Sequence, residues 1–114
     1  MTTAHVDTTT DDGGRRLRLA VVGEVDLSNA GAVEDALVAA ISNEATEVSV
    51  DLGAVEYLDS AGLRLLFSLV SRLAVLQISL ELVVPFDSPS RRAVELSGLA
   101  AVARLTPEAS PPFS

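Results

Sequence analysis

A single serine lies between a strand-like segment and a strongly apolar, helix-like segment, at the joint Asp59-Ser60-Ala61-Gly62-Leu63. A serine at a helix N-terminus lies near unsatisfied backbone N–H groups and the positive end of the helix dipole, and both favour a phosphate there. We therefore take Ser60 as the candidate functional centre. The structural alternative is a serine that only caps the helix.

Composition argues against most catalytic uses of this serine. A serine hydrolase needs a histidine base, and the only histidine, His5, lies near the start of the chain. The absence of lysine and cysteine argues against a P-loop, a receiver domain and a histidine–cysteine metal site. Magnesium binding by carboxylates alone stays open, although no spacing indicates it. We predict no enzymatic activity, no cofactor and no metal.

The length and composition of the chain predict one soluble domain. Its 114 residues suffice for a single core, and 48% of them are apolar. The lack of cysteine favours a reducing compartment, so we expect a cytoplasmic protein. The first twenty residues lack an apolar run typical of a signal peptide. The most apolar segment is interrupted by Arg64 and Arg72, which argues against a membrane span.

Negative charge is concentrated in the first half of the chain. The net charge is −8, and the segment from Leu19 to Leu63 holds nine acidic residues and no basic residue. This pattern predicts an acidic face that attracts a basic protein partner and disfavours nucleic acid. The alternative is a surface whose charge serves only solubility.

Hydrophobic periodicity predicts strands alternating with helices. Strands are expected at about 16–25, 47–52, 78–85 and 102–106. Helices are expected from an N-cap at Ser28 to about Asn43, from Ser60 to Val75, and from Ser88 or Ser90 to Gly98. Residues 1–14 should be a flexible start with a weak first strand and a hairpin turn. Residues 15–106 should form the domain, and residues 107–114 a disordered tail.

Strands separated by helices predict right-handed crossovers and a mostly parallel sheet. Because polar residues alternate with apolar ones in the strands, the helices should cover mainly one face. The loops at 23–28, 53–60 and 86–90 should then meet at one edge of the sheet. Asp26, Asp59, Ser60 and Asp87 are expected to be neighbours there.

Three motifs carry a family resemblance: VVGEVDLSNA, VDLGAVEYLDSAGLRLL and SRRAVELSGLAAVARL. Together they resemble a STAS domain of the bacterial anti-sigma factor antagonist type over about residues 15–105. The resemblance implies an α/β fold with a mixed, mostly parallel sheet of four to five strands and helices mainly on one face. It also implies a transcription regulator without catalytic activity, which binds an anti-sigma factor and so frees a sigma factor.

In that family the anti-sigma factor is a serine kinase that phosphorylates one serine of the antagonist, and a phosphatase removes the phosphate again. Ser60 matches that serine. The phosphate would add negative charge to an already acidic surface, and its expected effect is repulsion and steric blockage at the partner interface. Ala61 stands where many relatives have a second hydroxyl, Gly62 should let a partner backbone approach, and Arg64 could pair with the phosphate or with Asp59. The expected partner-binding residues are Asp26, Ser28, Asp59, Ser60, Ala61, Gly62, Arg64 and Asp87.

Two further questions stay open from the sequence. A STAS module could instead serve a transporter or lipid-transport assembly, or bind a small ligand; direct contact with nucleic acid or a membrane is not expected. The oligomeric state is also open, because a first strand at the sheet edge could pair with another chain.

Overall fold

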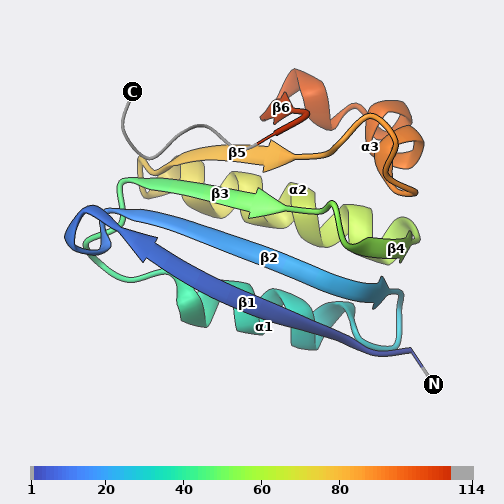
Figure 1. Ribbon diagram of the computed structural model, residues 1–114, viewed down its shortest axis with the longest axis horizontal. Helices are drawn as coiled ribbons and strands as arrows, with labels where there is room; N and C mark the ends of the chain where they lie inside the picture. Colours follow the sequence, from blue (N-terminus) through green and yellow to red (C-terminus); the bar gives the residue numbers. More distant parts are fainter. Residues whose placement is uncertain (1, 109–114) are drawn as a thin grey trace.

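A computed structural model describes residues 2–108 of the chain as one six-stranded sheet with helices behind it (Figure 1). In chain order the elements are β1 (Ala4–Asp11), the 3-10 turn η1 (Asp12–Gly14), β2 (Arg16–Val25), α1 (Ala30–Ala40), β3 (Glu47–Asp51), β4 (Val55–Leu58), α2 (Ser60–Val75), β5 (Ser79–Val83), α3 (Arg91–Ser97), the 3-10 turn η2 (Leu99–Ala101) and β6 (Arg104–Thr106).

The sheet is mixed and mostly parallel, as predicted. Its order is β1-β2-β3-β5-β6, with β1 antiparallel to β2 and the other pairs parallel. The count is six strands instead of four to five, because β4 lies in the connection that was expected to be a loop. β4 continues the sheet beside the end of β2, where Val25 pairs with Leu58. Four residues are too few for alternation to reveal a strand in the sequence.

The start of the chain is more regular than expected. β1 pairs with β2 over all eight of its residues, although only a weak strand was predicted within a flexible start. The connecting turn uses positive φ angles at Gly13 (66°) and Gly14 (91°), as its Asp-Gly-Gly sequence predicted. Most of the expected disordered tail, residues 109–114, lies outside the described part of the chain.

One face of the sheet forms the core with α1 and α2, which confirms the prediction from strand alternation. Leu19 of β2, Val50 of β3 and Leu69 of α2 are fully buried between these layers. Burying each such side chain is worth about 1.5–3 kcal/mol. Leu66 and Leu73 of α2 are also buried, while three more apolar residues of this helix are partly buried against the core: Leu63, Phe67 and Val70. No helix among residues 2–108 is long and apolar enough to cross a bilayer.

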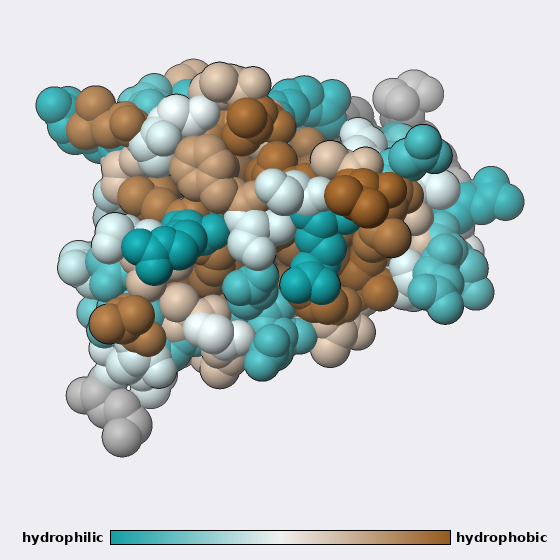
Figure 2. Space-filling view, turned by 180° about the vertical axis from the view of Figure 1, so that it is seen from behind, coloured by the Kyte–Doolittle hydropathy of each residue, from teal (hydrophilic) through white to brown (hydrophobic). Residues whose placement is uncertain are grey.

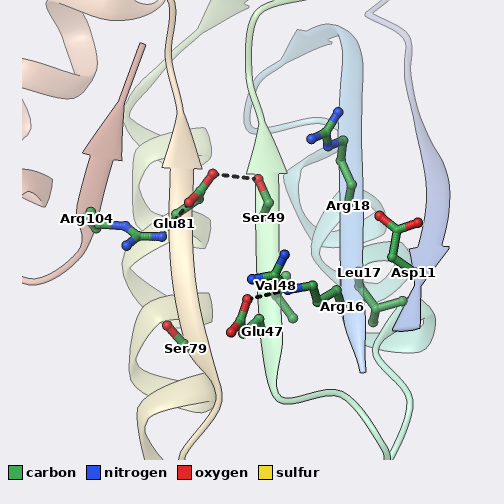
Figure 3. Close-up of a pocket in the computed structure, with 10 residues that line it drawn as sticks. All are labelled: Asp11, Arg16, Leu17, Arg18, Glu47, Val48, Ser49, Ser79, Glu81 and Arg104. Carbon is green, nitrogen blue, oxygen red and sulfur yellow. Dashed lines mark hydrogen bonds and ion pairs between the residues drawn. The ribbon is translucent and has the colours of Figure 1, made fainter. Parts of the chain in front are cut away.

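The opposite face carries a network of charged side chains (Figure 3). Glu81 is 4% exposed and accepts hydrogen bonds from Arg104 (2.5 Å) and Ser49 (3.3 Å). Arg16 forms an ion pair with Glu47 at 2.9 Å. The hollow here is only about 60 Å³, and three arginines share it with three acidic residues. The charges therefore balance, and the face has no excess charge to select an ionic ligand.

Candidate functional site

The N-terminus of α2 is capped by Asp59 and not by Ser60. One carboxylate oxygen of Asp59 accepts hydrogen bonds from the backbone N–H groups of Ala61 (2.9 Å) and Gly62 (3.1 Å). The backbone of Asp59 is extended, as an N-cap requires. Ser60 is consequently the first residue of the helix, and the reading of this serine as the cap is wrong.

The Ser60 side chain is exposed and has no structural task. Within residues 2–108 its hydroxyl makes no hydrogen bond, whereas the helix start around it is held by Asp59. The expectation that a phosphate here would find unsatisfied N–H groups needs correction, because Asp59 already occupies those of Ala61 and Gly62. A phosphate on Ser60 would lie beside a carboxylate and would compete with it for those donors.

The loop after β2 is held by Asp26. Its carboxylate accepts hydrogen bonds from the Ser28 hydroxyl (2.5 Å), the Ser28 backbone N–H (2.8 Å) and the Thr2 hydroxyl (2.6 Å). These bonds hold the pKa of the Asp26 carboxyl below its ordinary value, and the bond from the Ser28 hydroxyl contributes most. The expected N-cap at Ser28 is wrong: its hydroxyl is engaged by Asp26, and the residue before α1 is Asn29.

The two loops are joined to each other. The second carboxylate oxygen of Asp59 accepts a hydrogen bond from the backbone N–H of Leu27 (3.2 Å), and the Asp59 N–H donates to the carbonyl of Val25 (3.2 Å). Asp26, Asp59 and Ser60 therefore come together at the sheet edge, as predicted. The carboxylates of Asp26 and Asp59 both have internal hydrogen-bonding roles.

Gly62 serves the core of the protein. It is buried, and a Cβ atom there would overlap the Leu58 side chain and press against Val25. The close approach that was expected from a partner backbone is thus made by the protein's own side chains. Ala61 is buried as well, which leaves little of either residue for direct partner contact.

Arg64 and Asp87 are both surface residues, but in the described part of the chain neither makes the contact with the Asp59 region that was expected of it. Arg64 forms no ion pair with Asp59 within the described residues. Asp87 lies in the loop after β5, and no hydrogen bond or ion pair among residues 2–108 joins it to Asp26, Asp59 or Ser60. It shares their sheet edge without being part of their network.

Three exposed apolar side chains were missed as candidates. Leu27 is 79% exposed, Tyr57 52% and Phe86 72%. Leu27 and Phe86 follow β2 and β5, and Tyr57 lies within β4, all at the same edge. The Arg91 guanidinium lies 4.6 Å from the centre of the Phe86 ring. A sequence signal was available, because each apolar residue directly adjoins an acidic one in Asp26-Leu27, Glu56-Tyr57 and Phe86-Asp87.

A shallow hollow of about 290 Å³ adjoins this edge on the helix side of the molecule. Its residues come from the beginnings of α1 and α2 and from the loop before α1: Leu27, Ala30, Gly31, Glu34, Ala61, Arg64, Leu65 and Ser68. The Ser68 hydroxyl donates to Glu34 across it (2.7 Å). On this side of the molecule, hydrophobic side chains are exposed among polar ones (Figure 2).

The described residues include no group of three or more histidine, aspartate or glutamate side chains that could hold a metal ion. The site offers the exposed Ser60 hydroxyl at a joint held by Asp59, with exposed apolar side chains at the same sheet edge.

Comparisons with known proteins show the family of the chain. Residues 8–107 match a family model described as "Mlab, STAS domain". The chain is 36% identical over 87 residues to the anti-sigma-F factor antagonist RsfB of two Mycobacterium tuberculosis strains, which covers 76% of this chain and 70% of each relative. These relatives are named for antagonising a protein factor, in line with the prediction of a regulator without catalytic activity.

Two solved structures resemble the fold. A crystal structure of an anti-sigma factor antagonist from Mycobacterium paratuberculosis superposes with a TM-score of 0.80 and 27% identity, covering 93% of this chain and 87% of the other. The anti-sigma factor antagonist SpoIIAA in its unphosphorylated form superposes with a TM-score of 0.65 and 16% identity, covering 93% and 90%. At this level of sequence identity, the resemblance to SpoIIAA shows a shared fold only.

Proposed function

The chain belongs to the STAS domain family, and we propose that it is an anti-sigma factor antagonist whose binding is switched off by phosphorylation of Ser60. Its partner would be an anti-sigma factor that acts as a serine kinase, and a phosphatase would restore the hydroxyl. The relatives named as antagonists favour this role over that of an accessory module in a transporter assembly.

The observation that carries the proposal is the free hydroxyl of Ser60. It is exposed at the first position of α2 and makes no hydrogen bond within residues 2–108, while Asp59 performs the capping. A kinase can therefore modify it without breaking an internal contact. Ala61 beside it has no hydroxyl, so the motif offers one acceptor.

The surroundings support a protein partner of defined chemistry. Apolar side chains of Leu27, Tyr57 and Phe86 stand out at the edge, each next to a carboxylate in the chain. Large apolar and aromatic side chains commonly supply much of the binding energy of an interface, and charge complementarity speeds association. The partner surface should therefore present apolar pockets surrounded by basic residues.

The switch would act by charge and not by unfolding. Phosphorylation adds a charge of about −1.5 to −2 at neutral pH. That charge would lie beside Asp59, whose oxygen already occupies the N–H groups of Ala61 and Gly62. In the interface the phosphate would be repelled by the Asp59 carboxylate, would lose its hydration against the partner's apolar pockets and would block the partner's close approach, while the helix keeps its cap.

Labelling tests the acceptor. The protein is incubated with a candidate anti-sigma kinase and radiolabelled ATP, and we expect label on the wild type and none on Ser60→Ala. Ser42→Ala, which removes an exposed hydroxyl just after the C-terminal end of α1, is the matched control and should be labelled normally. Undiminished label on Ser60→Ala would exclude Ser60 as the acceptor.

Binding tests the switch. Ser60→Asp should weaken binding to the anti-sigma factor at least tenfold. Ser60→Asn, whose side chain has nearly the same shape as aspartate, should bind like wild type, because only aspartate adds charge. Both should unfold at the wild-type temperature, since Ser60 has no internal hydrogen bond among the described residues. Equal binding by the two variants would contradict switching by charge.

A further inference from the structure

Among residues 2–108, no strand pairs with the outer edge of β1. β1 is the terminal strand of the order β1-β2-β3-β5-β6, and within this part of the chain it pairs with β2 alone. Glu24 N–H donates to the carbonyl of Thr3 (2.9 Å), which makes Thr3 and Glu24 a hydrogen-bonded pair. Because such pairs alternate along an antiparallel ladder, the N–H and C=O groups that point outward are those of Ala4, Val6, Thr8 and Thr10.

This edge has few of the features that usually prevent edge pairing. Natural sheets protect long edge strands with prolines, bulges or charged side chains, lysine above all. The eight residues AHVDTTTD contain neither proline nor lysine, and their register with β2 is unbroken; the carboxylates of Asp7 and Asp11 are their acidic groups. Residues 7–11 are all exposed. An edge of this length with so little protection is suited to pairing with another strand.

We propose that this edge pairs with the same edge of a second copy of the chain, forming an antiparallel β1–β1 dimer with its two-fold axis at Val6. A two-fold axis perpendicular to the strands, as proposed here, makes the two identical strands antiparallel. In this register Val6 faces Val6 of the second copy, and Ala4 faces Thr8. All of these residues present outward N–H and C=O groups, so both strands form a continuous ladder.

An imidazole–carboxylate pairing between the two copies favours this register. It places His5 opposite Asp7 of the second copy, twice over by symmetry, at positions between the hydrogen-bonded pairs where opposing side chains are closest. In the single chain the same two groups already lie 3.5 Å apart, from His5 Nε2 to Asp7 Oδ2. A two-fold axis at Asp7 would instead place two carboxylates opposite each other, which destabilises a strand pair.

The dimer leaves the proposed partner site accessible and does not rest on that function. β1 begins at the Ser60 edge, because it runs antiparallel to β2 and Thr2 contacts Asp26 there. Pairing two antiparallel β1 strands therefore joins the two sheets side by side and directs their Ser60 edges toward opposite ends (Figure 1 shows β1 at the lower margin of the sheet).

Sedimentation velocity of the whole chain over a wide concentration range tests the dimer. We expect a dimer that dissociates on dilution. Thr8→Pro should sediment as a monomer at every concentration, because its outward N–H is removed while the β1–β2 ladder is kept. Thr8→Val retains that N–H and should dimerise like wild type. A wild type that is always monomeric, or a Thr8→Pro variant that still dimerises, would overturn the proposal.

Two further variants test the register. His5→Asp should abolish the dimer, and the exchange His5→Asp with Asp7→His should restore it, because the opposing pair is rebuilt with its members swapped. The natural chain has no cysteine, so Val6→Cys on the axis should form a disulfide-linked dimer on mild oxidation, whereas Thr9→Cys should not. Thermal unfolding verifies that each variant is folded. Equal cross-linking at both positions would exclude the axis at Val6.

Discussion

The Asp59 carboxylate joins the helix that carries Ser60 to the loop that carries Leu27. One oxygen caps α2 through Ala61 and Gly62, and the other accepts the N–H of Leu27, 32 residues earlier in the chain, at 3.2 Å. A single side chain thus holds two loops of the candidate site in one arrangement. It is a positioning residue for the surface around Ser60.

Removing this carboxylate should loosen the joint. Asp59→Ala should lower the free energy of unfolding by about 0.5–2 kcal/mol, the usual cost of losing an N-cap. Asp59→Asn keeps one acceptor oxygen and should lose less. Urea denaturation followed by circular dichroism measures both. Wild-type stability of Asp59→Ala would show that the cap contributes nothing.

Gly23 is required by the approach of β1. Its φ angle is +116°, and a Cβ atom there would overlap the carbonyl oxygen of Thr3. Gly23→Ala should therefore destabilise the fold by about 1–3 kcal/mol.

Gly31→Ala is the matched control for that substitution. Gly31 lies in α1, and no atom outside its own stretch of helix lies within 4 Å of the position that a Cβ atom would take. Alanine should therefore raise stability by up to about 1 kcal/mol through helix propensity. Both changes add one methyl group, so urea midpoints that shift in the same direction would contradict the structural distinction.

Stability should depend on pH through Asp26. Its pKa in the folded protein lies below its ordinary value of 3.8, because Ser28 and Thr2 donate to the carboxylate. The unfolded chain then takes up the proton at a higher pH than the folded chain. The stability that this carboxylate contributes is complete above the unfolded pKa and is lost as the pH falls through the folded pKa.

Asp26→Asn tests this titration, because it cannot ionise. The difference in unfolding free energy between wild type and variant should be constant near neutral pH and change in favour of the variant as the pH falls below about 4. Urea titrations at a series of pH values measure it. A difference that does not vary with pH would show that Asp26 has the same pKa in both states.

The buried Glu81 should depend on Arg104. Glu81 is 4% exposed, so Arg104→Ala removes one ion-pair partner of a desolvated carboxylate and should cost about 1–3 kcal/mol. Glu81→Gln in the same chain removes the charge and should recover part of that loss. A double-mutant cycle by urea denaturation measures the coupling. Strictly additive effects would mean that the ion pair contributes nothing to stability.

Much of the fold could be predicted because it depends on local patterns. The alternation of Leu17, Leu19 and Val21 predicted both β2 and its buried face, and the apolar period after Ser60 predicted the span of α2. Gly98 ends α3 with a φ of 88°, as a glycine at that position indicated. β4 escaped prediction because its four residues are defined by pairing with β2 and not by their own pattern.

The sequence by itself determined the STAS fold, the place of Ser60 at the start of α2, and the meeting of Asp26 with Asp59 at one sheet edge. Only the tertiary structure decided what each side chain does there. Asp59 and not Ser60 is the cap, Gly62 faces Leu58 and not a partner, and Ser28 is bound to Asp26. Periodicity reports which face of an element is buried, whereas hydrogen-bond partners depend on atoms that folding brings together from distant parts of the chain.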